Sequence, residues 1–218
     1  IMEPIMLHQG LNRNDARDKA VDMLRAVGIA SPETRIKEYP YQLSGGMRQR
    51  VMIAMALSCN PSLLIADEPT TALDVTIQAQ VLSLMNKLRM EFKAAIMFIT
   101  HDLGVIAHMA DDVVVMYLGR VVEKASVDDI FFQPKHPYTI GLMNSIPSLT
   151  STKEKRLIPI EGVVPGFLQA GEGCGFASRC PKKMEQCTRL NPSLTEVAPE
   201  HYAACWLHTD ENQGAHRI

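Results

Sequence analysis

Two short segments of this chain have residue types and spacings that suit nucleotide chemistry. Residues 44–46 read Ser-Gly-Gly before a predicted helix, and glycines there let bare backbone N–H groups approach a phosphate. The helix dipole adds about half a positive charge at that end. The apolar run 63–66 ends in Asp67 and Glu68, and an acid pair at a strand end suits Mg²⁺ and a hydrolytic water. Together the two segments predict nucleotide binding and hydrolysis.

The order and spacing of these segments resemble the signature helix and the Walker B strand of the ATP-binding subunits of ABC transporters. Residues 69–74 continue as the family's D-loop, and His101 follows the apolar run 94–100, where the family has its switch histidine. Each feature alone is usually structural, because Gly-Gly is a permissive turn and a strand-end histidine is common. The resemblance implies an α/β fold. Its parts are a partial P-loop NTPase-like (RecA-like) parallel sheet core, a helical signature subdomain and a small, irregular, Cys-rich C-terminal extension.

The resemblance also implies a role for each site residue. Glu68 would be the base that polarises water, Asp67 would hold Mg²⁺, and His101 would contact the γ-phosphate. Asp74 lies in the D-loop, which crosses to a partner subunit, and it is also a good helix N-cap. The signature would cap ATP that the partner holds, and its residues for this are Ser44, Gly45, Gly46 and Gln49. The implied cofactors are ATP and Mg²⁺.

The sequence contains no phosphate-binding loop of the form G-x-x-x-x-G-K-[ST], since no glycine in its 218 residues is followed by lysine. The chain also opens at Ile1 and not at an initiator methionine. We therefore expect a C-terminal part of a longer ATPase. Alone it should be inactive, because Asp67 and Glu68 lack the loop that delivers nucleotide, whereas the signature segment could still serve a partner's ATP.

Composition sets limits on the kind of protein. The chain is 46% hydrophobic with a net charge of -2, which is ordinary for a soluble protein and gives no charge-based reason to bind nucleic acid. Its apolar runs, such as 51–57, fall well short of the roughly 18 residues of a membrane span. Membrane association would therefore have to come through a partner.

The spacing of apolar residues predicts an alternation of helices and strands. Asn12 and Asp15 resemble a capping box that opens a helix ending before Gly28, and its apolar stripe is Ala16, Ala20, Leu24 and Val27. Further elements are expected as helix 46–59, strand 63–66, helix 75–92, a fully buried strand at 94–100, and a hairpin of 113–118 with 120–123. We divide the chain into a partial helical signature subdomain (1–60), a RecA-like core (61–130) and a C-terminal extension (131–218).

The segment from His136 to Thr139 narrows the resemblance. It follows the hairpin and a short helix at 128–132, and it is similar to the C-terminal extension of oligopeptide and dipeptide (peptide/nickel) importer ATPases. That resemblance implies an ATP-hydrolysing subunit that energises peptide import, bound peripherally to the cytoplasmic face of the bacterial inner membrane. The implied partners are an identical or homologous ATPase subunit, the transmembrane permease subunits and, indirectly, a peptide-binding protein. The transported solute does not follow from these residues.

Four cysteines lie in the extension: Cys174, Cys180, Cys187 and Cys205. Four thiolates can hold a [4Fe–4S] cluster, whose ligand spacings vary, whereas structural zinc sites prefer Cys pairs two to four residues apart, and the chain has none. The stretch 174–181 resembles a cluster-binding loop of some dipeptide importer ATPases. We therefore expect an iron–sulfur cluster, with zinc and free thiols as alternatives. Disulfides are least expected, because cytosolic thiols stay reduced.

Two other functional classes remain open. The chain could be a noncatalytic module that lends its signature to a partner ATPase or carries a metal-cluster domain. It could also be a soluble ABC ATPase of DNA repair or translation, since these share residues 44–46 and the acid pair. The His136–Thr139 segment and the four cysteines argue against that last class.

Overall fold

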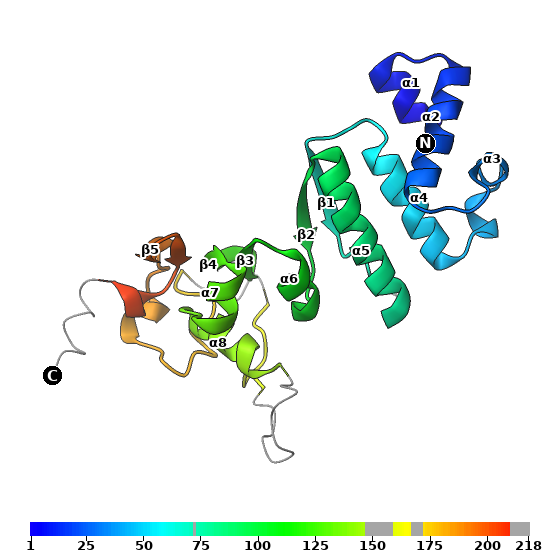
Figure 1. Ribbon diagram of the computed structural model, residues 1–218. Helices are drawn as coiled ribbons and strands as arrows, with labels where there is room; N and C mark the ends of the chain where they lie inside the picture. The colour runs from blue at the N-terminus through cyan, green and yellow to red at the C-terminus, as the bar shows by residue number, and fades with distance from the viewer. Residues whose placement is uncertain (72, 147–158, 167–171, 210–218) are drawn as a thin grey trace. The chain divides into compact units, whose positions relative to one another are not determined.

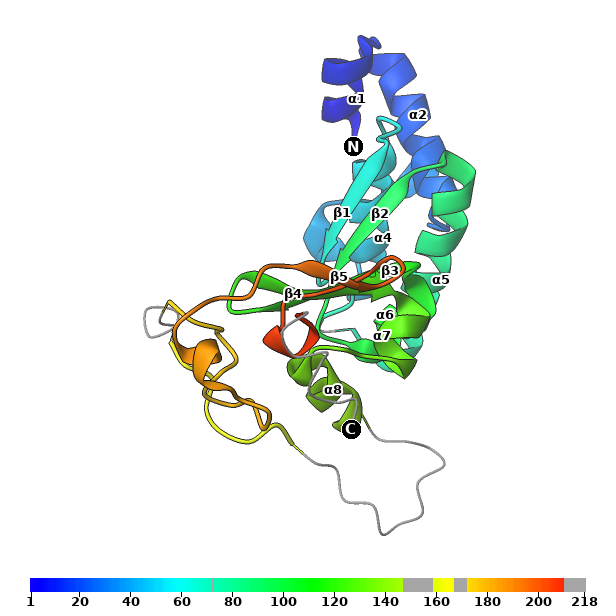
Figure 2. The same ribbon diagram turned by 90° about the vertical axis from the view of Figure 1, so that its left-hand side faces the viewer.

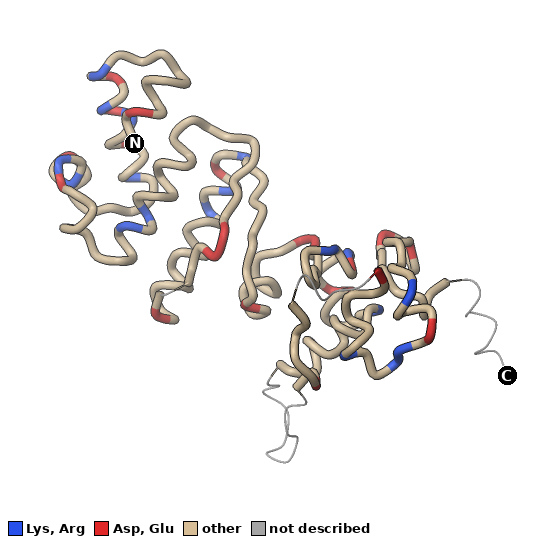
Figure 3. Tube along the Cα trace, turned by 180° about the vertical axis from the view of Figure 1, so that it is seen from behind, with Lys and Arg blue, Asp and Glu red and all other residues tan. Residues whose placement is uncertain are grey.

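A computed structural model describes residues 1–71, 73–146, 159–166 and 172–209 (Figure 1). The chain divides into two compact units, residues 1–105 and 106–218, and helix α6 (Leu103–Met109) spans the division. Acidic and basic residues are interspersed along the trace of both units (Figure 3). Among the helices described, none combines the length and the apolar character needed to cross a membrane.

The first unit begins with a cluster of helices. Asn12 caps α2, since its side chain accepts the backbone N–H groups of Asn14 and Asp15, and Gly28 follows the helix with a left-handed φ of 75°. The predicted stripe of α2 is buried, and α1 packs on it through Ile5. The elements are α1 (Met2–Gln9), α2 (Arg13–Ala26), α3 (Pro32–Arg35), the 3₁₀ turn η1 (Pro40–Gln42) and α4 (Gly45–Leu57). Helix α4 ends at Leu57, two residues before Cys59, where the sequence predicted its end.

The rest of the first unit is a two-stranded parallel sheet with a long helix. Strand β1 (Leu63–Asp67) pairs with β2 (Ala95–Ile99), and α5 (Val75–Phe92) connects them as the α/β prediction requires. Helix α5 buries Val81, Met85 and Leu88 at helical spacing, whereas Phe92 at its end is half-buried. In Figure 2 the two strands lie side by side in front of α4 and α5.

The prediction that 94–100 forms a fully buried strand is wrong for this unit. Alternate residues of β2 are exposed, with Met97 at 45% and Ile99 at 46%, and so are Leu63 and Ile65 of β1. Because successive side chains of a strand point to opposite faces, these four residues share one face of the sheet. An unbroken apolar run cannot reveal which of its two faces is covered.

The second unit is built on an antiparallel sheet of four strands in the order β3-β4-β6-β5. Its first two strands form the predicted hairpin, with a β-bulge between Val115 and Met116. Helices α7 and α8 lie on one side of the sheet (Figure 2). The elements are β3 (Asp112–Tyr117), β4 (Arg120–Ser126), α7 (Val127–Phe132), α8 (Pro137–Asn144), η3 (Glu185–Thr188), β5 (Thr195–Ala198), β6 (His201–Ala203) and η4 (Trp206–His208).

A fully buried carboxylate joins β4, β6 and the start of α8. Glu123 lies 2.7 Å from Nε2 of the equally buried His201, and it accepts the backbone N–H groups of Lys135 and His136 at 2.6 and 2.9 Å. Nδ1 of His136 in turn accepts the N–H of Tyr138, which caps α8. Glu123 therefore fixes the His-Pro-Tyr segment to the hairpin, and removing one of its partners would leave a buried polar group without a hydrogen bond.

We predict that acid destabilises this unit through His136. Burial lowers its pKa to about 4, against the 6.5 of a free histidine, although Glu123 opposes the shift and His208 adds to it. Between these two pH values the unfolded chain binds a proton that the folded chain does not, so stability falls as pH falls through that window. The contribution is about 3 kcal/mol. Urea unfolding across this pH range should show it, and His136→Asn, which keeps an acceptor for Tyr138, should flatten the dependence. If the free energy of unfolding fell equally with pH in the wild type and in His136→Asn, His136 would not be the source of the acid sensitivity.

Candidate functional site

The predicted signature segment, residues 44–49, opens helix α4. Ser44 is the N-cap, and its Oγ accepts the backbone N–H of Met47 at 3.3 Å. That bond uses the hydroxyl oxygen as an acceptor, so its proton remains available to a phosphate oxygen. The backbone N–H groups of Gly45 and Gly46 belong to the first turn, which has no intrahelical partners for its donors. Gln49 lies four residues after Gly45, on the same side of the helix.

The two glycines differ in what surrounds them. A Cβ added at Gly45 would meet no heavy atom within 4 Å, so the space beside this position is open. A Cβ at Gly46 would lie 3.0 Å from Cγ2 of Ile77 on α5. One turn later, Arg50 of α4 donates to Oε1 of Gln80 at 3.3 Å. Gly46 therefore lets the signature helix pack closely on α5.

We predict that Gly46→Ala destabilises the first unit by about 1 kcal/mol, because overpacking against the branched Ile77 outweighs the gain in helix propensity. Gly45→Ala is the matched control and should not destabilise. In a double-mutant cycle by urea unfolding, Gly46→Ala should cost less in an Ile77→Ala background. Additive effects of the two substitutions would exclude the proposed contact.

The acid pair lies at the carboxyl end of β1, next to the end of β2. Asp67 is the last residue of β1 and pairs with Ile99 of β2, and the N–H of Glu68 donates to the carbonyl of Ile99 at 2.8 Å. Glu68 Oε1 lies 3.1 Å from Nδ1 of His101, two residues beyond the end of β2. Adjacent parallel strands thus bring together the two predicted site residues that are 33 positions apart in the sequence.

The backbone of Glu68 is strained, whereas its side chain is held by hydrogen bonds. Its φ is 44°, a left-handed conformation that costs a non-glycine residue on the order of 1 kcal/mol or more. Hydrogen bonds from the Thr71 hydroxyl, at 2.9 Å, and from His101 lower the pKa of the carboxyl below its usual value. Glu68 is therefore ionised at neutral pH and able to accept a hydrogen bond from water.

Asp74 caps α5, as its side chain suggested, by accepting the N–H of Ile77 at 2.9 Å. The same first turns of α5 contact Gly46 and Arg50 of the signature helix. The structure thus places Asp74 on the element that adjoins the signature segment, and places Asp67, Glu68 and His101 together at the strand ends. It records no contact between these two groups among the residues it describes.

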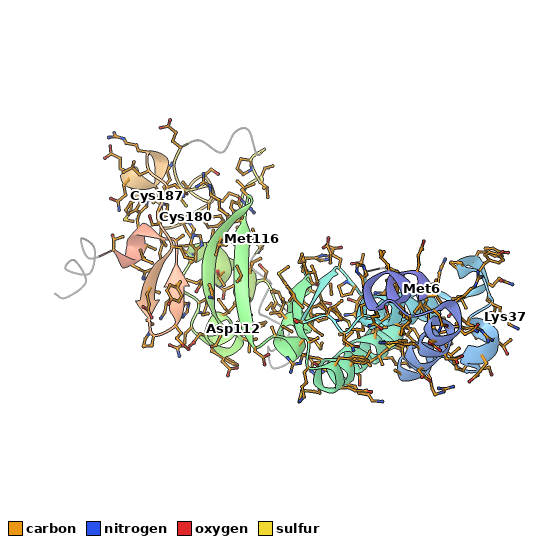
Figure 4. All side chains as sticks on the ribbon, turned by 90° about the horizontal axis from the view of Figure 1, so that it is seen from above. Met6, Lys37, Asp112, Met116, Cys180 and Cys187 are labelled. Carbon is orange, nitrogen blue, oxygen red and sulfur yellow. The ribbon has the colours of Figure 1, made fainter. Side chains whose placement is uncertain are left out.

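The four cysteines of the extension line one pocket in the second unit. Figure 4 shows Cys180 and Cys187 beside each other. Cys174 donates its N–H to the carbonyl of Cys187 at 2.8 Å, and this approach requires Gly173, where a Cβ would lie 2.4 Å from that carbonyl oxygen. The four cysteine residues therefore gather although their sequence spacings are irregular.

Aromatic residues hold this pocket against the rest of the unit. The ring of the buried Phe176 lies 5.3 Å from that of Tyr117, 5.4 Å from Tyr138 and 5.9 Å from His136. Two residues of the His-Pro-Tyr segment thus pack on the stretch that carries Cys174. Desolvation raises the pKa of the Cys205 thiol to about 11, so a metal would have to displace its proton to bind there.

The described residues include no group of three or more His, Cys, Asp or Glu side chains placed to hold a metal ion. The expected iron–sulfur cluster, like the zinc alternative, therefore has no support from metal-ligand geometry. The five cysteines are all free thiols. The pocket lined by the four cysteines of the extension is small, about 10 Å³, which is room for roughly one water molecule.

Three features of the structure were not predicted from the sequence. Gln78 of α5 donates to Asp102, next to His101, at 3.1 Å, and no local pattern marks a contact across 24 residues. The left-handed backbone of Glu68 gave no signal either, since glycine is the residue that normally marks such a position. Glu123 and His201, which support the cysteine-bearing unit, are 78 residues apart.

Comparison with known proteins matches two segments of the chain to family models. Residues 4–71 match "ABC transporter", and residues 122–187 match "Oligopeptide/dipeptide transporter, C-terminal region". The probable peptide ABC transporter ATP-binding protein y4tR of Sinorhizobium fredii is 54% identical over 206 residues, which is 94% of this chain and 62% of that protein. The oligopeptide transport ATP-binding protein AppD of Bacillus subtilis is 53% identical over 97% of this chain and 64% of its own length.

Solved structures also resemble the chain. The cbiO1 protein of Clostridium perfringens, described as part of the ABC transporter complex cbiONQ, aligns with a TM-score of 0.49 and 30% sequence identity. The alignment covers 56% of this chain and 48% of that one. The chain spans less than two thirds of the length of the two sequence relatives named above.

Proposed function

We infer that this chain, a relative of the ATP-binding subunits of peptide ABC transporters, is part of an ATPase that energises peptide import across a bacterial inner membrane. The observation that carries the inference is the pairing of Glu68 with His101 at the ends of two adjacent parallel strands. A glycine-opened helix tip and matches to both family models accompany this pair. A chance contact between Glu68 and His101 would not explain the helix tip and the two family matches as well.

Each residue of the site then has a chemical task. Glu68, held ionised by Thr71 and His101, accepts the proton of the attacking water. The contact with Glu68 uses Nδ1 of His101, so a phosphate oxygen would have to be contacted by Nε2, which can donate only where it also carries a proton. The exposed carboxylate of Asp67 offers the hard oxygen ligand that Mg²⁺ prefers, and the bound ion would neutralise phosphate charge.

The signature segment would act on a nucleotide that another subunit holds. Ser44 and the N–H groups of Gly45 and Gly46 form an anion-binding helix end, with Gln49 on the same side. The proposed partners are therefore a homologous or identical ATP-binding subunit, with Asp74 facing it, and the transmembrane permease subunits. Such an assembly would hold the chain at the cytoplasmic face of the membrane, with a peptide-binding protein as an indirect partner.

The experiment that tests this function is ATP-dependent pairing. The chain is mixed with a P-loop-bearing ATP-binding subunit of a peptide transporter and run on a sizing column with and without ATP and Mg²⁺. We expect a complex that requires both, since the phosphates bridge the two proteins. A complex that forms equally well without ATP, or no complex at all, would contradict the proposal. A pair that forms but never hydrolyses ATP would favour the noncatalytic interpretation.

We propose in addition that the four cysteines bind a [4Fe–4S] cluster. The proposal is supported by the four thiol residues that line one pocket and by Gly173, which permits the close approach of Cys174 to Cys187. Bound at four thiolates, the cluster would cross-link residues from 174 to 205 and help to order this segment. The small volume of the pocket means that the thiols would have to separate to admit the cluster.

We predict that anaerobically purified protein shows broad visible absorption and nearly equal amounts of iron and sulfide. Cys187→Ser should abolish both, because a [4Fe–4S] cluster that loses one of four thiolates is destabilised. Cys59→Ser, which removes the one cysteine of the first unit, should change neither. A colourless protein that carries zinc would reject the cluster in favour of the alternative ion.

A further inference from the structure

The loop that carries His101 is held together by Asp102. Its N–H donates to Oγ1 of Thr100 at 3.0 Å, and its Oδ1 accepts the N–H groups of Gly104 and Val105 at 2.8 and 3.2 Å. We define residues 100–102, between β2 and α6, as the switch loop. These contacts are all local, so they fix the shape of the loop but not its position relative to the rest of the unit.

A contact from outside the loop comes from α5. Nε2 of Gln78 donates to Oδ2 of Asp102 at 3.1 Å, and the carboxylate, being an acceptor, selects the amide nitrogen of Gln78 as its partner. Gln78 also donates its backbone N–H to the carbonyl of Asp74, the cap of α5, at 2.8 Å. The helix that begins at the proposed D-loop is thus tied directly to the switch loop.

His101 itself has little to hold it in place. Its side chain is 79% exposed, and its recorded partner is Glu68, which is itself 46% exposed. A contact between two such exposed side chains is weak on its own. The position of the imidazole therefore depends on the backbone next to it, which Asp102 fixes. Although burial raises the pKa of Asp102, hydrogen bonds from Gln78, Val105 and Gly104 bring it below its usual value, so this anchor remains charged.

We propose that Gln78 is a positioning residue for the ATPase reaction: through Asp102 it holds His101 where it contacts Glu68. The proposal deepens the proposed function and rests on it for the reaction, while the contact it explains exists in the chain alone. Gln78 touches neither Glu68 nor His101 in any recorded contact, so it acts through the loop. Its neighbour Gln80 serves a different purpose, since it accepts from Arg50 of the signature helix.

Nuclear magnetic resonance of the His101 ring in the full 218-residue chain tests this without ATP. In the wild type, Glu68→Gln should shift the ring resonances, because the carboxylate lies 3.1 Å from Nδ1. In a Gln78→Ala background this response should be lost. A Gln80→Ala background, on the same helix, should preserve the full response. Gln78→Glu should also lose it at neutral pH, where two carboxylates face each other, and regain it when acid protonates the new side chain.

A response to Glu68→Gln that persists in Gln78→Ala would overturn the proposal, and so would its equal loss in Gln80→Ala, which would indicate a general loss of structure. A wild-type ring that does not respond would also overturn it, because there would be no contact to position. None of these measurements involves nucleotide. Failure of the proposed function would instead show in the ATP-dependent pairing, so the two failures are distinguishable.

Discussion

Ser44→Arg should lower ATP turnover by about 10²–10³-fold when the chain is paired with a P-loop-bearing subunit, the loss expected when one preorganised donor to a developing charge is removed. The substitution removes the hydroxyl that caps α4, and it places a long side chain over the open N–H groups of the first turn. Both changes act where the partner's phosphates would bind. Steady-state phosphate release from the mixed pair measures the effect.

Two control variants separate this effect from a loss of folding or solubility. Met52→Arg adds the same side chain to the same helix at a position that is 56% exposed, and it should leave turnover unchanged. Ser44→Thr keeps both the hydroxyl and the cap, and it should retain most of the activity. Turnover in the Ser44→Arg pair at the wild-type rate would remove the signature segment from the mechanism.

Glu68→Gln should lower turnover by about 10²–10⁴-fold when residues 1–218 are joined to the P-loop portion of a related ATP-binding subunit, because a general base contributes on that order. The amide keeps the size of the side chain but cannot take a proton from water. In the joined protein, single-turnover measurement should show that nucleotide still binds, since only the hydrolytic step is affected.

The matched control is Glu91→Gln, which makes the same change on the exposed surface of α5 and should have no effect on turnover. The chain alone should hydrolyse no more ATP than its own Glu68→Gln variant, since its 218 residues contain no P-loop. Glu68-dependent hydrolysis by the chain alone would reveal a phosphate-binding loop of a different form. Undiminished turnover in the joined Glu68→Gln protein would identify another residue as the base.

Local chemistry made part of the fold predictable. Helix α5 spans 75–92 as predicted, because Asp74 caps it and its apolar residues recur at helical spacing. Asn12 opens α2 for the same kind of reason. Glu68 and His101 were both named from the family resemblance, but their contact was not predicted; it arises because adjacent parallel strands bring their carboxyl ends together.

Long-range pairing could not be predicted. Strand β6 joins the hairpin by pairing with β4, about 80 residues away in the sequence, and the burial of Glu123 depends on His201 from that distant strand. A charged residue within a strand normally faces solvent, so the sequence did not predict that Glu123 would be buried with three hydrogen-bond partners. The exposed face of β2 was mispredicted for a related reason, because hydrophobicity does not say which face is covered.

The left-handed backbone at residue 68 sets stability against activity in any attempt to engineer this protein. Glycine adopts that conformation without strain, so a selection for thermal tolerance would favour Glu68→Gly over substitutions that keep a Cβ. Such a thermostabilised variant would also lack the carboxylate that faces His101. Mutant libraries designed to raise the thermal stability of this chain should therefore leave Glu68 unchanged and vary other positions.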